Sequence, residues 1–126
     1  MAGGRKKHVT ETFRNLIAWQ KARILARNIY MVTKGFPREE QFGLVSQLRR
    51  AAVSIVSNIA EGRGRGTKRD FCHFLMQARG SLYELETQIE LANDLEYFEG
   101  VEVPPLLKAC DELGRVLNGL INSTQS

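Results

Sequence analysis

Apolar residues recur at alternating steps of three and four between residues 71 and 92, and this spacing constrains the fold more than any other feature. Residues spaced this way lie on one face of an α-helix and form the seam along which helices pack in bundles. The segment therefore predicts a long helix that starts at Thr67 and fades near Phe98, with Thr67 and Asp70 as a weak capping-box start. The seam consists of Phe71, Phe74, Leu75, Ala78, Leu82, Leu85, Ile89 and Ala92.

Three further segments carry the same helical period. They cover residues 13–34, residues 37–61, and a stretch that begins at Pro104 or Pro105. No stretch shows the alternation of apolar and polar residues that a half-buried strand requires. We therefore expect an all-α fold without a sheet. Short loops between the four helices favour an antiparallel up-down-up-down four-helix bundle.

The length of 126 residues is that of one domain. We expect a flexible basic arm at 1–12, the four-helix bundle domain at 13–122 and a frayed tail at 123–126. No apolar run approaches the ~18–20 residues of a membrane span, and the first residues lack the apolar core of a secretory signal. Cys72 and Cys110 fit free thiols in a reducing compartment. The expected localisation is cytoplasmic, with no membrane partner.

The net charge of +4 is unevenly distributed along the chain. Residues 1–70 carry 15 Lys and Arg against 5 Asp and Glu, whereas residues 71–126 carry 3 against 9. This division favours either a basic face for an anionic partner or complementary faces that meet each other. Charges dispersed over solvated helix faces are the plainer alternative.

The basic residues concentrate in the stretch NIAEGRGRGTKRDF at residues 58–71. Its three glycines supply backbone freedom for a reversal between two helices. A turn does not require four cations, and cations at the start of a helix oppose its dipole, so an anion bound there would explain them. Contact with a nucleic acid and a merely solvated turn are the two interpretations. The candidate contact residues are Arg63, Arg65, Lys68 and Arg69 in this stretch, Arg14, Lys21 and Arg23 in the first helix, and Arg5, Lys6 and Lys7 in the arm.

The sequence contains no recognisable motif for catalysis or for cofactor binding. Phosphate-binding loops need a glycine where Thr67 stands, and they need a preceding strand. Cys72 and His73 are neighbours on a helix, so their side chains diverge by about 100° and cannot share a metal ion. The carboxylate pairs Glu84/Glu86 and Asp111/Glu112 are not stacked at helical spacing, and no Glu-x-x-His motif occurs. We expect no cofactor, no metal and no catalytic residue, so the protein is predicted not to be an enzyme.

Two arginines in the middle of the second expected helix lie outside the basic stretch and need partners of their own. Arg49 and Arg50 are expected to pair with acids of the third helix, such as Glu84, Glu86 or Glu90, within or between subunits.

Small and apolar residues suggest close helix contacts. Gly80 and Ser81 predict a close crossing in the middle of the third helix. The first helix is apolar over most of its circumference, including Ile17, Trp19 and Ala22. A helix of this kind usually has a second packing partner, and we expect a homo-oligomer.

Five motifs give the chain a specific resemblance. They are FP at 36–37, QLRRA at 47–51, SI at 54–55, NIAEG at 58–62 and ARGSL at 78–82. In this order they resemble the bacterial four-helix bundle proteins, also called the large-subunit ribosomal RNA intervening-sequence proteins. The resemblance extends from residue 13 to about residue 95. It implies an antiparallel four-helix bundle that assembles as a ring-like homopentamer.

Relatives of that family include the accessory variability determinant proteins of diversity-generating retroelements, which bind nucleic acid and a reverse transcriptase through a basic surface of the pentamer. The resemblance implies RNA or DNA, and a reverse transcriptase, as candidate partners. It brings no catalytic residues with it. The primary hypothesis is a homopentameric, non-enzymatic protein that binds nucleic acid. The alternative is a protein-interaction scaffold in which basic and acidic halves of neighbouring subunits face each other and no nucleic acid binds.

Overall fold

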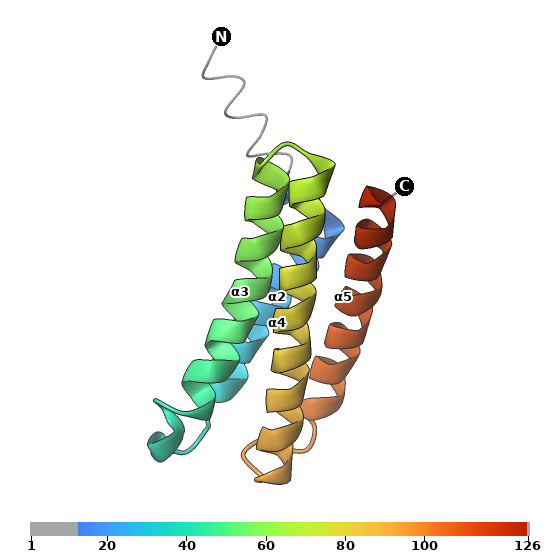
Figure 1. The fold of residues 1–126 in the computed structure, drawn as a ribbon. Coiled ribbons are helices and arrows are strands. Elements are labelled where there is room, and N and C mark those ends of the chain that lie inside the picture. Colours follow the sequence, from blue (N-terminus) through green and yellow to red (C-terminus); the bar gives the residue numbers. More distant parts are fainter. Residues whose placement is uncertain (1–12, 126) are drawn as a thin grey trace.

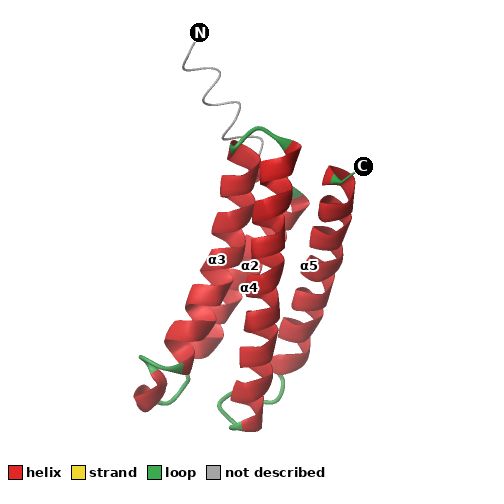
Figure 2. Ribbon diagram, viewed as in Figure 1, coloured by secondary structure: helices red, strands yellow, loops and turns green. Residues whose placement is uncertain are grey.

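The computed structural model describes residues 13–125, and the basic arm at 1–12 lies outside them. The described chain forms four long helices and no strand, so the all-α prediction is confirmed (Figure 2). Figure 1 shows the helices side by side, with the α3–α4 turn at one end and the α2–α3 and α4–α5 connections at the other. The helices are α2 (Ile17–Thr33), α3 (Leu44–Gly64), α4 (Lys68–Asp94) and α5 (Val103–Thr124), with a 3-10 turn η1 (Arg38–Glu40) before α3.

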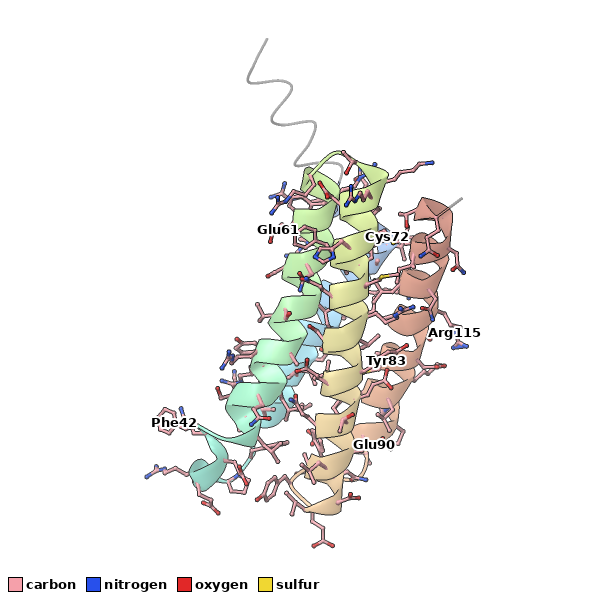
Figure 3. All side chains as sticks on the ribbon, viewed as in Figure 1. Phe42, Glu61, Cys72, Tyr83, Glu90 and Arg115 are labelled. Carbon is pink, nitrogen blue, oxygen red and sulfur yellow. The ribbon has the colours of Figure 1, made fainter. Side chains whose placement is uncertain are left out.

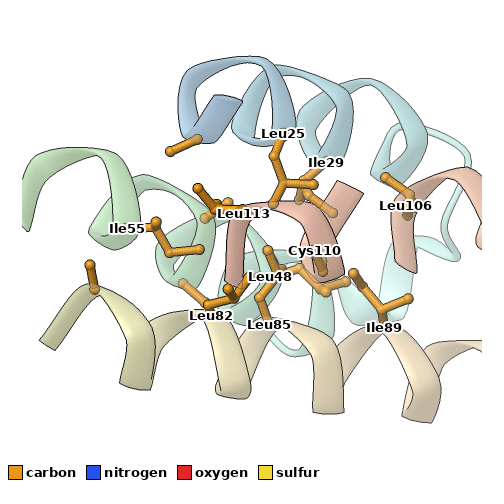
Figure 4. Close-up of a cluster of buried hydrophobic side chains, with 14 of the residues drawn as sticks. Leu25, Ile29, Leu48, Ile55, Leu82, Leu85, Ile89, Leu106, Cys110 and Leu113 are labelled. Atoms are coloured by element: carbon orange, nitrogen blue, oxygen red, sulfur yellow. The ribbon is translucent and has the colours of Figure 1, made fainter. Parts of the chain in front are cut away.

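One apolar core holds the helices together. α2 and α4 each contact both α3 and α5 but not each other, so α2 and α4 lie at opposite corners. The predicted seam of α4 faces this core, with Phe71 nearly buried and Phe74 half-buried at its start. Figure 4 shows how side chains from all four helices converge. Fully buried members include Leu25 and Ile29 of α2, Leu48 and Ile55 of α3, Leu82, Leu85 and Ile89 of α4, and Cys110 and Leu113 of α5.

The first two helices begin later than the sequence predicts. α2 begins at Ile17 rather than at Phe13, because the backbone is extended at Leu16 (φ −73°, ψ 127°). α3 begins at Leu44 rather than near Pro37, because η1 and a turn ending at Gly43 intervene.

The last two helices also end at different residues from those predicted. α4 ends at Asp94, short of Phe98, because Glu96 adopts a left-handed backbone conformation with φ 62°. Left-handed residues of this kind commonly close helices. The tail predicted to fray at 123–126 is helical as far as Thr124, whose hydroxyl donates to the carbonyl of Ile121 at 2.6 Å.

Arg49 joins α3 to the C-terminal end of α2. Its Nε donates to Thr33 Oγ1 at 3.0 Å, and its terminal nitrogen donates to the carbonyl of Tyr30 at 3.2 Å. The guanidinium also lies 4.6 Å from the centre of the Tyr30 ring. A cation is favourable there because the last carbonyls of a helix carry partial negative charge. The predicted pairing with acids of α4 is therefore wrong for Arg49, and Arg50 forms no ion pair with any described residue.

The two cysteines differ in burial, which predicts different reactivity. Burial, reinforced by the nearby charge of Glu86, raises the pKa of the Cys110 thiol to about 12, and Cys72 is only half-buried. Alkylation requires the thiolate. At pH 8 we expect iodoacetamide to modify Cys72 in the folded protein, and Cys110 only after unfolding in urea. Mass spectrometry of native and unfolded samples, with Cys72→Ser as the control, measures this. Equal labelling of Cys110 in both samples would contradict its placement in the core.

Candidate nucleic-acid interface

The turn between α3 and α4 is tighter than its three glycines suggest. α3 continues through Gly62 and ends at Gly64, with Arg65 as its C-cap. Only Gly66 has a positive φ, of 86°, so only this glycine supplies the left-handed conformation of the reversal. The prediction that the second helix ends at residue 61 is therefore wrong, as is the prediction that all three glycines serve the turn.

Gly62 has a packing role instead. It is buried, and a Cβ atom placed there would lie 2.6 Å from Cβ of Phe74 and 3.3 Å from Cδ1 of Phe71. The missing side chain therefore lets α4 approach α3 closely just before the reversal. At Gly64 an added Cβ would meet no atom within 4 Å.

The start of α4 is capped as the sequence predicts. Thr67 has an extended backbone, and its Oγ1 accepts a hydrogen bond from the backbone N–H of Asp70 at 3.1 Å. Asp70 also places one negative charge in the first turn, where the helix dipole favours it. Lys68 and Arg69 occupy the same turn against the dipole.

Two of the four predicted cations of the turn fold back on their own chain. Arg63 lies over the Phe71 ring at 5.6 Å, and Arg65 lies over the Phe74 ring at 5.0 Å. Arg65 also pairs with the carboxylate of Glu61 at 2.8 Å (Glu61 is labelled in Figure 3). Both arginines remain exposed to solvent. Arg63 and Arg65 would therefore have to exchange some of these contacts within the chain in order to bind an anion.

Lys68 and Arg69, unlike Arg63 and Arg65, make no side-chain contact of this kind with the described residues. Both side chains are exposed. Neither has an ion pair, a side-chain hydrogen bond or an aromatic ring as partner among the described residues. They are the strongest candidates for contact with an anion.

The predicted basic residues of the first helix do not form one cluster with the turn. Arg14 lies over the Phe13 ring at 5.0 Å. It directly precedes α2, whose start lies at the same end of the molecule as the α3–α4 turn (Figure 1). Lys21 pairs with Glu112 of α5 at 3.6 Å, and Arg23 lies 5.5 Å from the Trp19 ring. Arg14 therefore belongs to the basic end, whereas the other two lie farther along α2. Arg5, Lys6 and Lys7 fall outside the described residues.

Charge is polarised along the length of the molecule. We call the end formed by residues 61–70 and Arg14 the basic end. The opposite end, which we call the acidic end, holds both remaining connections, and the cations within these connections are Lys34 and Arg38. The cations of the α3–α4 turn and the acids of the two other connections thus lie at opposite ends of the molecule. The acidic end contains Glu39, Glu40, Asp94, Glu96, Glu99 and Glu102.

The acidic end is fixed by hydrogen bonds to one carboxylate. Glu40 Oε2 accepts from the hydroxyl of Tyr97 at 2.7 Å, and Oε1 accepts from the backbone N–H of Leu44 at 3.2 Å. These two bonds, the first above all, lower the pKa of Glu40 and keep it charged. Glu40 therefore joins the start of α3 to the α4–α5 connection. The sequence carried no signal for this contact, because 57 residues separate its partners.

A family model described as 23S rRNA-intervening sequence protein matches residues 14–119. The chain belongs to this family. The predicted resemblance to intervening-sequence proteins is thus confirmed, and the link to retroelement proteins stays a prediction. Among curated proteins, none matched the chain.

A solved structure similar to this intervening-sequence protein comes from Bacteroides thetaiotaomicron. It is a protein of unknown function from the S23 ribosomal protein family. The two share 24% sequence identity over 84% of this chain and 96% of the other, with a TM-score of 0.77. At this identity the similarity shows the fold alone.

The described residues contain neither a membrane-spanning helix nor a metal-binding cluster. None of their helices has the length and apolar character needed to cross a membrane. No group of three or more His, Cys, Asp or Glu side chains within residues 13–125 is placed to hold a metal ion.

The packing of Gly62 gives a matched pair of substitutions. We expect Gly62→Ala to lower the free energy of unfolding by about 1–3 kcal/mol, because the new methyl group overpacks the contact with Phe74. Gly64→Ala, two residues on, is expected to leave it unchanged or to raise it by up to about 1 kcal/mol, because alanine favours helix. Urea unfolding followed by circular dichroism measures both. Equal effects at the two positions would rule out a close contact at Gly62.

Proposed function

We propose that this intervening-sequence protein is a non-enzymatic homo-oligomer, a homopentamer of up-down four-helix bundles, that binds RNA or DNA through its basic end. The observation that carries the proposal is the pair Lys68 and Arg69, exposed and without partners among the described residues at the start of α4. Two cations there cost stability, because the helix dipole repels them. A phosphate group bound beside them would offset that cost.

Assembly would strengthen weak contacts. In a ring of parallel subunits, every basic end faces the same side, so a single nucleic acid strand meets several copies of the pair at once. Neutralised phosphates release counterions, which makes such binding strongly dependent on salt. Linked weak contacts also raise the overall affinity.

The basic end supports binding by charge and shape rather than by base sequence. Proteins that bind single strands usually stack bases on exposed aromatic rings. Phe71 is nearly buried, and Phe74 is half-buried beneath the guanidinium of Arg65. Neither ring beside the turn presents a free face to a base. We therefore propose little sequence preference.

A double substitution tests the basic end directly. We expect Lys68→Gln with Arg69→Gln to weaken binding of a labelled single-stranded RNA and to reduce the slope of log Kd against log salt by about two, roughly one per lost phosphate contact. The matched control is Lys34→Gln with Arg38→Gln, which removes the same charge from the acidic end. Fluorescence anisotropy at several salt concentrations measures both, with duplex DNA as a second probe.

Three outcomes separate the hypotheses. A loss confined to Lys68→Gln with Arg69→Gln supports the basic end. An equal loss in the control shows that net charge alone decides binding and contradicts the proposal. Absence of binding by the folded wild-type protein at low salt favours the scaffold alternative.

A reverse transcriptase is the protein partner suggested by the sequence resemblance alone. In that role the chain would be an accessory subunit that holds nucleic acid beside the enzyme. Co-elution of the protein with a retroelement reverse transcriptase in gel filtration tests this part of the proposal, and separate elution contradicts it.

A further inference from the structure

The outer face of α2 carries an apolar line. Ile17, Ile24 and Met31 follow one another at seven-residue intervals, with 60%, 60% and 55% of their surfaces exposed. Heptad spacing places them along one side of the helix over about 21 Å. A continuous exposed line of large apolar side chains marks a surface that another molecule covers.

The line borders two apolar grooves between α2 and α5. One groove, of about 420 Å³, is lined by Ile17, Val116 and Leu120 among others. The other groove, of about 230 Å³, lies at the opposite end of the contact between α2 and α5 and is lined by Met31 and Leu106 among others. The apolar surface of α2 is therefore hollowed at both ends, which gives side chains of a partner places to insert.

A second line of similar length lies on α4. Met76, Tyr83 and Leu91 are 40%, 55% and 48% exposed, and they span about 22 Å of helix (Tyr83 is labelled in Figure 3). Gly80 lies among them, and an added Cβ there would meet no atom within 4 Å. Glycine inside a helix costs about 1 kcal/mol relative to alanine. No contact with the described residues explains this glycine, whereas close approach by a second helix does.

Of the two residues at the predicted crossing, Ser81 contacts another helix and Gly80 does not. Ser81 meets Ser54 of α3, with 2.9 Å between the two hydroxyl oxygens. Gly80 faces outward. The surface of α4 at Gly80 is therefore open to a helix of another molecule.

The two lines carry opposite charge. α2 contains no acidic residue, and its Arg27 is exposed without an ion-pair partner in the described chain. After Arg69, α4 contains one cation, Arg79, which donates to Asn118 at 2.9 Å. The exposed acids beside the α4 line are Glu84, Glu90 and Asp94, none of which forms an ion pair within residues 13–125.

We infer that α2 of one copy docks on α4 of a second copy of this chain, with the apolar lines in contact and Arg27 facing the acids of α4. Because α2 and α4 lie at opposite corners, the two surfaces are different patches on one molecule, so the contact is head-to-tail rather than two-fold. Repeated head-to-tail contacts generate a ring when the rotation closes. The inference rests on the self-association in the proposed function, and it is independent of nucleic-acid binding.

Two variants that each lose one surface test the contact. Ile24→Asp disables the α2 surface and leaves α4 intact, whereas Gly80→Gln fills the gap on α4 and leaves α2 intact. We expect the wild-type protein to form an oligomer and each variant alone to be a monomer. An equimolar mixture is expected to double in mass, because each variant keeps the surface that the other lacks. Light scattering with gel filtration, over a concentration series, measures these masses.

The controls separate docking from folding. Ser57→Gln, at an exposed position on α3, is expected to keep the wild-type mass. Gly80→Gln is expected to keep or raise the melting temperature, because its side chain enters open space. A monomeric wild type, variants with the wild-type mass, or a mixture that stays monomeric at the highest concentration would each overturn the inference. Lys68→Gln with Arg69→Gln is expected to keep the wild-type mass whatever its effect on nucleic acid, so the two proposals fail separately.

Discussion

The close approach of α3 and α4 at Gly62 is the contact on which the basic end depends. Without a side chain at this position, Phe74 packs against the backbone of α3, and the chain reverses only a few residues later. The same packing places two aromatic rings under the guanidinium groups of Arg63 and Arg65. Packing of the apolar seam thus gathers the cations in a small volume, although their mutual repulsion and the dipole of α4 oppose this arrangement.

Two further contacts, made by Arg49 and Glu40, help to separate the acidic connections from the basic turn. Arg49 ties α3 to the end of α2, and Glu40 ties the start of α3 to the loop after α4. These contacts hold the two remaining connections, which together carry five acids and two cations, at the end opposite to the basic turn (Figure 1). A head-to-tail ring through α2 and α4 would place all basic ends on one side. The proposed nucleic-acid surface and the proposed subunit contact then use different parts of the chain without competing.

Much of the fold follows from local pattern. The seam at 71–92 and the cap at Thr67 were predictable because each depends only on spacing along one helix. Gly62 was not, because three alternating glycines look equivalent in sequence and only the neighbouring ring of Phe74 distinguishes them. The partner of Arg49 was missed because backbone carbonyls of another helix leave no signal in side-chain composition.

The candidate site was predicted at the level of residue type rather than role. The sequence places four cations beside one turn, and it does not show that Arg63 and Arg65 lie over aromatic rings while Lys68 and Arg69 stay free of partners in the described chain. Lys21 looked equivalent to the others until its pairing with Glu112 assigned it to the contact between α2 and α5. Such distinctions depend on which helix faces carry acids or rings, and tertiary packing decides that.

Glycine amides provide the most direct test of the basic end, because glycines lie at both ends of the molecule. In protein labelled with ¹⁵N-glycine and titrated with single-stranded RNA, the account predicts chemical-shift changes at Gly64 and Gly66 that disappear at high salt. The amides of Gly35, Gly43 and Gly100, at the acidic end, are predicted to stay unchanged. Binding accompanied by shifts at the acidic end, with Gly64 and Gly66 unaffected, would contradict the account.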